Sequence, residues 1–315
     1  MDESISSAPS QPDQAPISNF LAGPSGVGWG FLLYLAMFAA LLFLTSLGLQ
    51  FLLPTGMARI WRSVAGEGAF IVSAFVPGFV MARLEDRPFG MYGLPRQGAF
   101  GRQFWLGLLW GIVALSVLMV TMRIAGVFYF GGLALNGFRL FKFAVFWAVF
   151  FVVVGLFEEF FLRGYSQFTL SRGLGFWPTA VILSLAFGAI HLGNQGESKV
   201  GALGAAIIGL FFCMTLKRTG NLWFAVGLHA SWDWGETFLY SVPNSGLVAP
   251  GHLLNSHFQG PDWLTGGSVG PEASVFVFIV MFLMWLLFHF LYPAKKGVDA
   301  GLAPPVESTP VPYQE

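Results

Sequence analysis

Eight apolar stretches dominate this chain and restrict how it can fold. They cover approximately residues 31–53, 64–82, 104–122, 143–162, 177–192, 201–216, 222–241 and 274–292. A helix that crosses a bilayer needs about 20 mostly apolar residues. Charged residues make up only 10% of the chain, whereas soluble domains carry about 25%. We therefore predict an all-α, polytopic membrane helix bundle with about eight transmembrane helices.

The two ends of the chain differ in composition from the part between them. Residues 1–28 and 294–315 are rich in Pro and polar residues, a composition typical of disordered segments. The first segment has no basic stretch before an apolar run, so we do not expect a signal peptide. We predict a disordered tail at 1–28, a transmembrane bundle at 29–293 and a second disordered tail at 294–315.

Lysine and arginine outside the apolar stretches predict the orientation of the bundle. Ten lie on the side of the N-terminus (Arg83, Arg87, Arg96, Arg102, Arg163, Arg172, Lys217, Arg218, Lys295 and Lys296) and six on the other side (Arg59, Arg62, Arg123, Arg139, Lys142 and Lys199). Because basic loops stay in the cytoplasm, this bias predicts cytoplasmic N- and C-termini. We expect a bacterial inner-membrane protein surrounded by lipid. The net charge of zero gives no reason to expect a nucleic-acid partner.

The segment "GLFEEFFLRGY" places three charges inside an apolar helix. An acidic residue at the centre of such a helix costs roughly 2.5–3.5 kcal/mol, so intramembrane ionisable groups are functional candidates by default. Glu159 and Arg163 are four residues apart and can pair on one face. Glu158 points about 100° away from that face. We therefore expect Glu158 to be the carboxylate that is free to meet a water molecule or a substrate.

Two further polar sites lie on the following apolar stretches. "LAFGAIHLG" places Phe187 and His191 four apart, and "GLHASWDWGETF" places His229, Asp233 and Glu236 on one helix face. If the glutamate helix continues to Gly173, then Glu159 and His191 both lie roughly 20 Å from the turn that joins their helices. We expect these sites to meet in a polar cavity within one half of the bilayer, open to the cytoplasm.

One carboxylate beside two imidazoles is suited to the hydrolysis of an amide. Glu158 can remove a proton from water, while His191 and His229 donate to the developing oxyanion. The same three side chains are also a ligand set for catalytic zinc, and this metal-dependent alternative remains open. The sequence has neither the HExxH motif of zinc proteases nor a Gly-Ser nucleophile motif beside a histidine.

Three motifs in this region resemble a known family. Glu158-Glu159-x-x-x-Arg163, Phe187-x-x-x-His191 and His229-x-x-x-Asp233 are similar to the EExxxR, FxxxH and HxxxN/D motifs of the CPBP family. That family comprises the type II CAAX prenyl endopeptidases and their bacterial relatives, including bacteriocin self-immunity proteins. The resemblance implies an eight-helix intramembrane glutamate peptidase that needs no cofactor, with a peptidase-like core at about 140–241.

The resemblance also implies a role for each motif residue. Glu158 would activate the water, with Glu159 and Arg163 supporting it. His191 and His229 would stabilise the oxyanion and position the water, and Asp233 would orient the site. Asp233 stands where the family often has Asn, and an ionised Asp beside His229 would favour the imidazolium form, which Asn would not.

We expect the substrate to be a peptide or a membrane protein. The label "CAAX" does not imply that substrates are prenylated, because bacterial relatives need not cut prenylated proteins. Two other classes of function remain open. One is a non-catalytic self-immunity or scaffold protein of the same fold, and the other is a transporter that uses the Glu and His residues as a proton relay. The oligomeric state cannot be predicted from these patterns.

Overall fold

The structure is a computed structural model that describes residues 18, 20, 21, 23, 26–194 and 196–294. Helix α2 begins at Gly26, inside the stretch of residues 1–28 that is predicted to be a disordered tail. Most of that tail, and the predicted C-terminal tail from residue 295 onward, lie outside the described residues.

Most of the described chain is helical. The main helices are α2 (Gly26–Leu52), α3 (Arg59–Leu84), α4 (Arg102–Ile124), α5 (Gly137–Glu159), α6 (Gln167–Leu174), α7 (Phe176–His191), α8 (Lys199–Thr219), α9 (Trp223–Trp234) and α11 (Val275–Leu291). The π-helical turns are η2 (Phe160–Ser166) and η3 (Gly235–Tyr240), and the short elements are η1 (Phe89–Tyr92), α10 (Asp262–Thr265) and η4 (Pro271–Ala273). The strands β1 (Phe128–Tyr129) and β2 (His257–Phe258) pair antiparallel, with Phe128 opposite Phe258.

The predicted membrane bundle is confirmed. Within the described residues, five helical segments are long and apolar enough to cross a membrane: 26–52, 59–84, 102–124, 137–174 and 199–219. The helices α7 and α11 are apolar but shorter, and α9 continues directly into η3. Each of the eight predicted stretches therefore lies on a helix, whereas a count of eight spans remains a prediction. The glutamate helix extends from Gly137 to Leu174 and is kinked at Gly164, whose ψ of −114° is not helical. It ends at Gly175, whose positive φ of 83° suits glycine.

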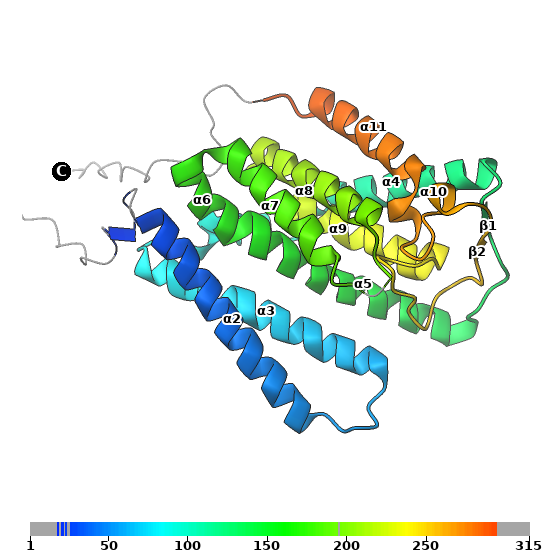
Figure 1. The fold of residues 1–315 in the computed structure, drawn as a ribbon, viewed down its shortest axis with the longest axis horizontal. Coiled ribbons are helices and arrows are strands. Elements are labelled where there is room, and N and C mark those ends of the chain that lie inside the picture. Colours follow the sequence, from blue (N-terminus) through cyan, green and yellow to red (C-terminus); the bar gives the residue numbers. More distant parts are fainter. Residues whose placement is uncertain (1–17, 19, 22, 24–25, 195, 295–315) are drawn as a thin grey trace, which may run out of the picture.

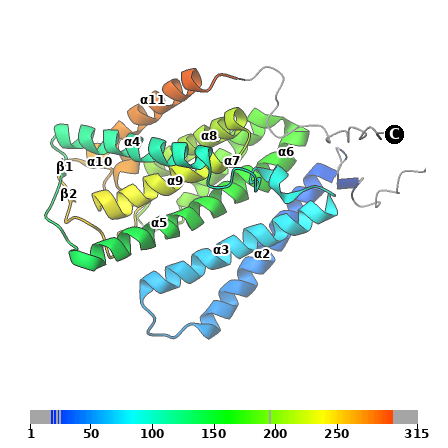
Figure 2. The same cartoon turned by 180° about the vertical axis from the view of Figure 1, so that it is seen from behind.

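Helix α9 lies at the centre of the bundle, with α4, α5 and α8 around it (Figures 1 and 2). Every residue from Trp223 to Asp233 is buried. Glycines allow α4 to approach α9 closely, because a Cβ on Gly107 or Gly111 would overlap the carbonyl oxygen of Phe224 or Leu228. In contrast, α2 and α3 form a hairpin that diverges from the other helices. Helix α2 buries only its first part, which leaves its apolar side chains to face lipid.

The bundle has two distinct ends, which we call the chain-end side and the loop side. Helix α2 begins and α11 ends on the chain-end side, where α6 also turns into α7 (Figure 1). The loop side carries the α2–α3, α4–α5 and α7–α8 connections and the long segment 241–274, which includes β2, α10 and η4.

A buried carboxylate ties several elements together on the chain-end side. Glu85, just after α3, accepts hydrogen bonds from the hydroxyls of Tyr165 (2.6 Å) and Tyr92 (3.0 Å). Arg172 of α6 lies 3.5 Å from the same carboxylate. Tyr165 follows Arg163 and Gly164 directly, so this clamp fixes the register of the helix that carries the paired glutamates.

Candidate active site

The paired glutamates lie at the end of α5, just before the π-helical turn η2. Arg163 Nη1 lies 3.4 Å from Glu159 Oε1, and both side chains are fully buried. The predicted Glu159–Arg163 pair is therefore confirmed. The guanidinium also lies over the ring of Phe187, 4.4 Å from its centroid, which adds a cation–π contact. The side chain of Glu158 points away from this pair and is 24% exposed.

His229 lies between three carboxylates. Its Nδ1 donates to Glu159 Oε1 at 2.9 Å. Its Nε2 lies 3.6 Å from Glu158 Oε2 and 3.5 Å from Asp233 Oδ2. The ring is stacked on Phe212 with the centroids 5.4 Å apart. Glu159 thus joins Arg163 to His229, and His229 in turn separates Glu158 from Asp233. Two of the predicted motifs are joined by direct contacts.

The third motif meets the other two through its phenylalanine. The centroid of the Phe187 ring lies 4.4 Å from that of His191 and 6.4 Å from that of His229, with both histidine rings edge-on to it. The same Phe187 ring contacts the Arg163 guanidinium. His191 lies at the end of α7, and its Nδ1 is 2.9 Å from the Phe187 carbonyl oxygen. Because a carbonyl only accepts, that nitrogen carries the hydrogen. The Nε2 atom of His191 is then left to contact water or a substrate.

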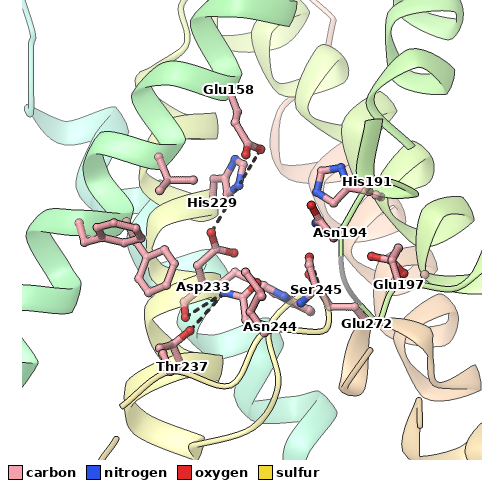
Figure 3. A pocket seen from close by; sticks show the side chains of 18 of the residues that line it. Glu158, His191, Asn194, Glu197, His229, Asp233, Thr237, Asn244, Ser245 and Glu272 are labelled. Atoms are coloured by element: carbon pink, nitrogen blue, oxygen red, sulfur yellow. Dashed lines mark hydrogen bonds and ion pairs between the residues drawn. The ribbon is translucent and has the colours of Figure 1, made fainter. Parts of the chain in front are cut away.

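A cavity of about 300 Å³ joins these side chains. Glu158, His191, His229 and Asp233 line it (Figure 3), whereas Glu159 and Arg163 do not belong to its lining. In Figure 3 the His191 ring faces His229 and Glu158 across the cavity. A space of this size falls at the lower end of the range for small-molecule sites.

The cavity opens on the loop side. Its lining includes Arg59 at the start of α3, Asn194 and Glu197 between α7 and α8, and residues 244, 245, 247–250 and 272 of the long segment after η3. The prediction that the site opens to the same side as the chain ends is therefore wrong. The predicted depth explains the error, because a site about 20 Å from the chain-end turn lies beyond the middle of a 30 Å hydrocarbon core.

Several lining residues were not predicted from the sequence. The polar ones include Glu67, Asn194, Glu197, Asn244, Ser245 and Glu272. Glu67 was detectable, because it is an acidic residue inside an apolar stretch. The others lie in connections without a periodic pattern, where folding alone brings them to the cavity. Burial raises the pKa of the Glu197 carboxyl, and the neighbouring charge of Glu272 raises it further.

The carboxylates that lie close enough together to hold a metal ion differ from the alternative zinc ligands considered above. Within the ranges that the structure describes, Asp233, Glu236 and Glu272 place one ligand atom each within 4.8 Å of the others. The alternative zinc set of Glu158, His191 and His229 does not meet this criterion in the described chain. Glu158 and His229 are adjacent, but His191 lies across the cavity.

The functional groups that the hydrolysis of an amide requires therefore face one another across this cavity. A carboxylate faces a polar space, one imidazole is adjacent to it, and a second imidazole presents a free nitrogen. Residues 140–235 match the family model described as "Type II CAAX prenyl endopeptidase Rce1-like". This segment is similar to the Rce1-like family. The match confirms the CPBP resemblance that the three motifs predicted.

The Rce1-like domain covers 96 of the 315 residues and contains all three motifs. It ends at Gly235, so Glu236 and Glu272 lie outside the match. No curated protein gives a significant match to the chain, and no solved structure does. Together with the apolar helices, the domain identifies an integral membrane protein with the fold of an intramembrane CAAX-type protease.

Proposed function

We propose that this protein is an intramembrane endopeptidase of the glutamate type. The observation that carries the proposal is the position of Glu158, which reaches a polar cavity 3.6 Å from His229 Nε2 while Glu159 is held by Arg163. The two adjacent glutamates thus have separate tasks. One is committed to an ion pair, and the other has no arginine or lysine partner within the described residues.

In the proposed reaction, the Glu158 carboxylate accepts a proton from a water molecule in the cavity. The water oxygen forms a bond to the scissile carbonyl carbon, and the carbonyl oxygen becomes an oxyanion. The proton then passes from Glu158 to the amide nitrogen, the C–N bond breaks, and an acid and an amine are released. General acid–base catalysis of this kind contributes about 10²–10⁴-fold.

The two histidines have different surroundings and therefore different proposed roles. His229 is oriented by Glu159 at its Nδ1, and its Nε2 lies near Glu158 and Asp233, so this second nitrogen is placed to bind the attacking water or the oxyanion. His191 Nε2 faces the cavity from the opposite side and positions the water or the substrate carbonyl. Glu159, Arg163 and Asp233 act through these groups. They orient His229, and Asp233 adds a charge that Asn would not supply.

We propose a peptide of a membrane-associated protein as the substrate, which enters from the loop side. On the positive-inside rule the chain-end side is cytoplasmic, as expected for a bacterial inner membrane. The cavity would then receive peptides from the external face of that membrane. The lining is acidic, with Glu67, Glu197 and Glu272 in addition to the motif carboxylates, which favours substrates that carry basic side chains.

A mixed peptide library tests the proposal. The purified protein in liposomes is incubated with the library beside its Glu158→Gln variant, both with a zinc chelator present. We expect defined new peptide ends with the wild type and none with the variant. Cleavage by both proteins would remove Glu158 from the mechanism. Cleavage by neither, with or without zinc, would indicate the non-catalytic scaffold or self-immunity function instead.

A further inference from the structure

Three acidic side chains meet at the end of the cavity nearest the loop side. Asp233 comes from α9, Glu236 from the π-helical turn η3, and Glu272 from η4 in the long segment that follows. One carboxylate oxygen of each lies within 4.8 Å of the other two. Asp233 and Glu272 line the cavity, and Figure 3 shows them approaching it from different elements.

Glu236 is the least expected member of this cluster. Its side chain is 0% exposed. Among the described residues, no donor forms a hydrogen bond of ordinary geometry with either carboxylate oxygen, although the Trp232 side chain lies nearby. A buried carboxylate without a partner costs several kcal/mol if it is charged. It is also close to two other carboxylates, which increases the repulsion. A bound cation would satisfy all three charges at once.

The neighbours of the cluster supply little positive charge. His229 is the ion-pair partner of Asp233, with its Nε2 3.5 Å from Asp233 Oδ2. Glu272 Oε2 accepts hydrogen bonds from the backbone N–H (2.9 Å) and the hydroxyl (2.8 Å) of Ser245. In the part of the chain that the structure describes, neither Lys nor Arg forms an ion pair with the three carboxylates.

We propose that Asp233, Glu236 and Glu272 bind a divalent cation that prefers oxygen ligands, with Ca²⁺ as the reference ion. Calcium lies about 2.3–2.6 Å from its oxygen ligands, so three oxygens spaced evenly around it are at most about 4.5 Å apart. The three carboxylate oxygens lie within 4.8 Å of one another, so a small inward movement of the side chains would bring them to calcium distance. Carboxylates alone, without Cys or a neutral His, favour Ca²⁺, Mg²⁺ or Mn²⁺ over Zn²⁺.

Such an ion would connect the loop side to the reactive centre. It would fasten the segment that carries Glu272 and Ser245 to α9, where His229 lies one helical turn before Asp233. It would also take up the charge of Asp233, which in the family pattern is often Asn. The site extends beyond the proposed peptidase function, because it includes two residues outside the Rce1-like domain.

Calorimetric titration measures the site without any peptide cleavage. The full-length protein is purified in detergent, stripped with a chelator, and titrated separately with CaCl₂, MgCl₂, MnCl₂ and ZnCl₂. We expect saturable binding of one Ca²⁺ or Mn²⁺ ion per chain and a rise of several degrees in the unfolding midpoint at saturation. Glu236→Gln should weaken binding at least tenfold. Glu67→Gln, which changes another acidic residue of the same cavity, should bind as the wild type does.

Two results would overturn the proposal. One is the absence of saturable binding by the folded wild-type protein. The other is zinc binding that is lost in His191→Gln and retained in Glu236→Gln, because this would assign the metal to the Glu158, His191 and His229 set. If Glu236→Gln does not fold, Glu272→Gln replaces it, since glutamine can still accept a hydrogen bond from Ser245. A protein that binds the ion but cuts no peptide would contradict only the proposed peptidase function.

Discussion

At the scale of single residues, one ion pair gives the two adjacent glutamates different surroundings. Glu159 is fully buried between Arg163 and His229, whereas Glu158 reaches the cavity. Removing one partner of a buried pair leaves the other charge uncompensated, which costs about 3–5 kcal/mol. Replacing a partly exposed carboxylate without an arginine partner leaves no such charge behind.

We therefore expect Glu159→Gln to lower the free energy of unfolding by about 3–5 kcal/mol, and Glu158→Gln to change it by less than about 1 kcal/mol. Thermal or denaturant unfolding of both variants in the same detergent measures the difference. Equal free energies of unfolding for the two variants would mean that the Glu159–Arg163 ion pair contributes no more to stability than the Glu158 carboxylate does.

Phe187 provides a second test at this scale, because its ring contacts Arg163, His191 and His229. Phe187→Leu keeps an apolar side chain but removes the cation–π contact, which is worth about 0.5–2 kcal/mol. We expect a fall in kcat of about 10-fold or more, since a small misplacement of the histidines slows the reaction strongly. Phe138→Leu, on an exposed ring of α5, is the matched control and should cleave at the wild-type rate.

At the scale of elements, the close approach of α4 to α9 positions His229 and Asp233. Gly111 of α4 faces the Leu228 carbonyl and the Ser231 hydroxyl, so an added Cβ has no space. Overpacking of this kind costs about 1–3 kcal/mol.

Gly111→Ala should lower the unfolding midpoint and reduce peptide cleavage, because α9 must shift to make room. The matched control is Gly48→Ala on α2, where a Cβ would meet no atom within 4 Å. It should be neutral or slightly stabilising, since Ala favours a helix by about 1 kcal/mol over Gly. Equal effects of the two substitutions on cleavage would show that this contact does not position α9.

The elements also show what the sequence could and could not predict. Apolar length located the helices on which the eight predicted stretches lie, because lipid imposes a minimum length on a spanning segment. The i,i+4 spacing predicted the Glu159–Arg163 pair, since it is local to one helix. Glu272 could not be predicted, because its approach to α9 depends on how residues 241–274 fold over the loop side. The apolar stretches and the i,i+4 spacing that reveal helices carry no information about how such a connection folds.

At the scale of the whole molecule, the cavity opens on the loop side, opposite the side on which α2 begins and α11 ends. Arg163 is buried in its ion pair, so it does not belong in the count of basic loop residues. Nine basic residues then remain on the chain-end side and six on the loop side. This distribution still predicts a cytoplasmic chain-end side, and it places the cavity opening on the external side.

Cysteine labelling of intact cells tests this orientation. Cys213 is buried and is first replaced by Ser. Single cysteines then replace Ser268 on the loop side or Gln97 on the chain-end side, both of which are exposed. A membrane-impermeant maleimide should label the Ser268→Cys variant in intact cells and the Gln97→Cys variant only after lysis. The reverse result would place the cavity opening in the cytoplasm.

The central claim is that Glu158 is the group that activates water, and a matched pair of variants tests it most directly. Once a cleaved peptide is known, its kcat is measured for the wild type, for Glu158→Gln and for Glu197→Gln, which changes an acidic residue of the same cavity. We predict a loss of at least about 100-fold for Glu158→Gln and less than about threefold for Glu197→Gln, with both variants folded. A folded Glu158→Gln variant that cleaves at the wild-type rate would contradict the account.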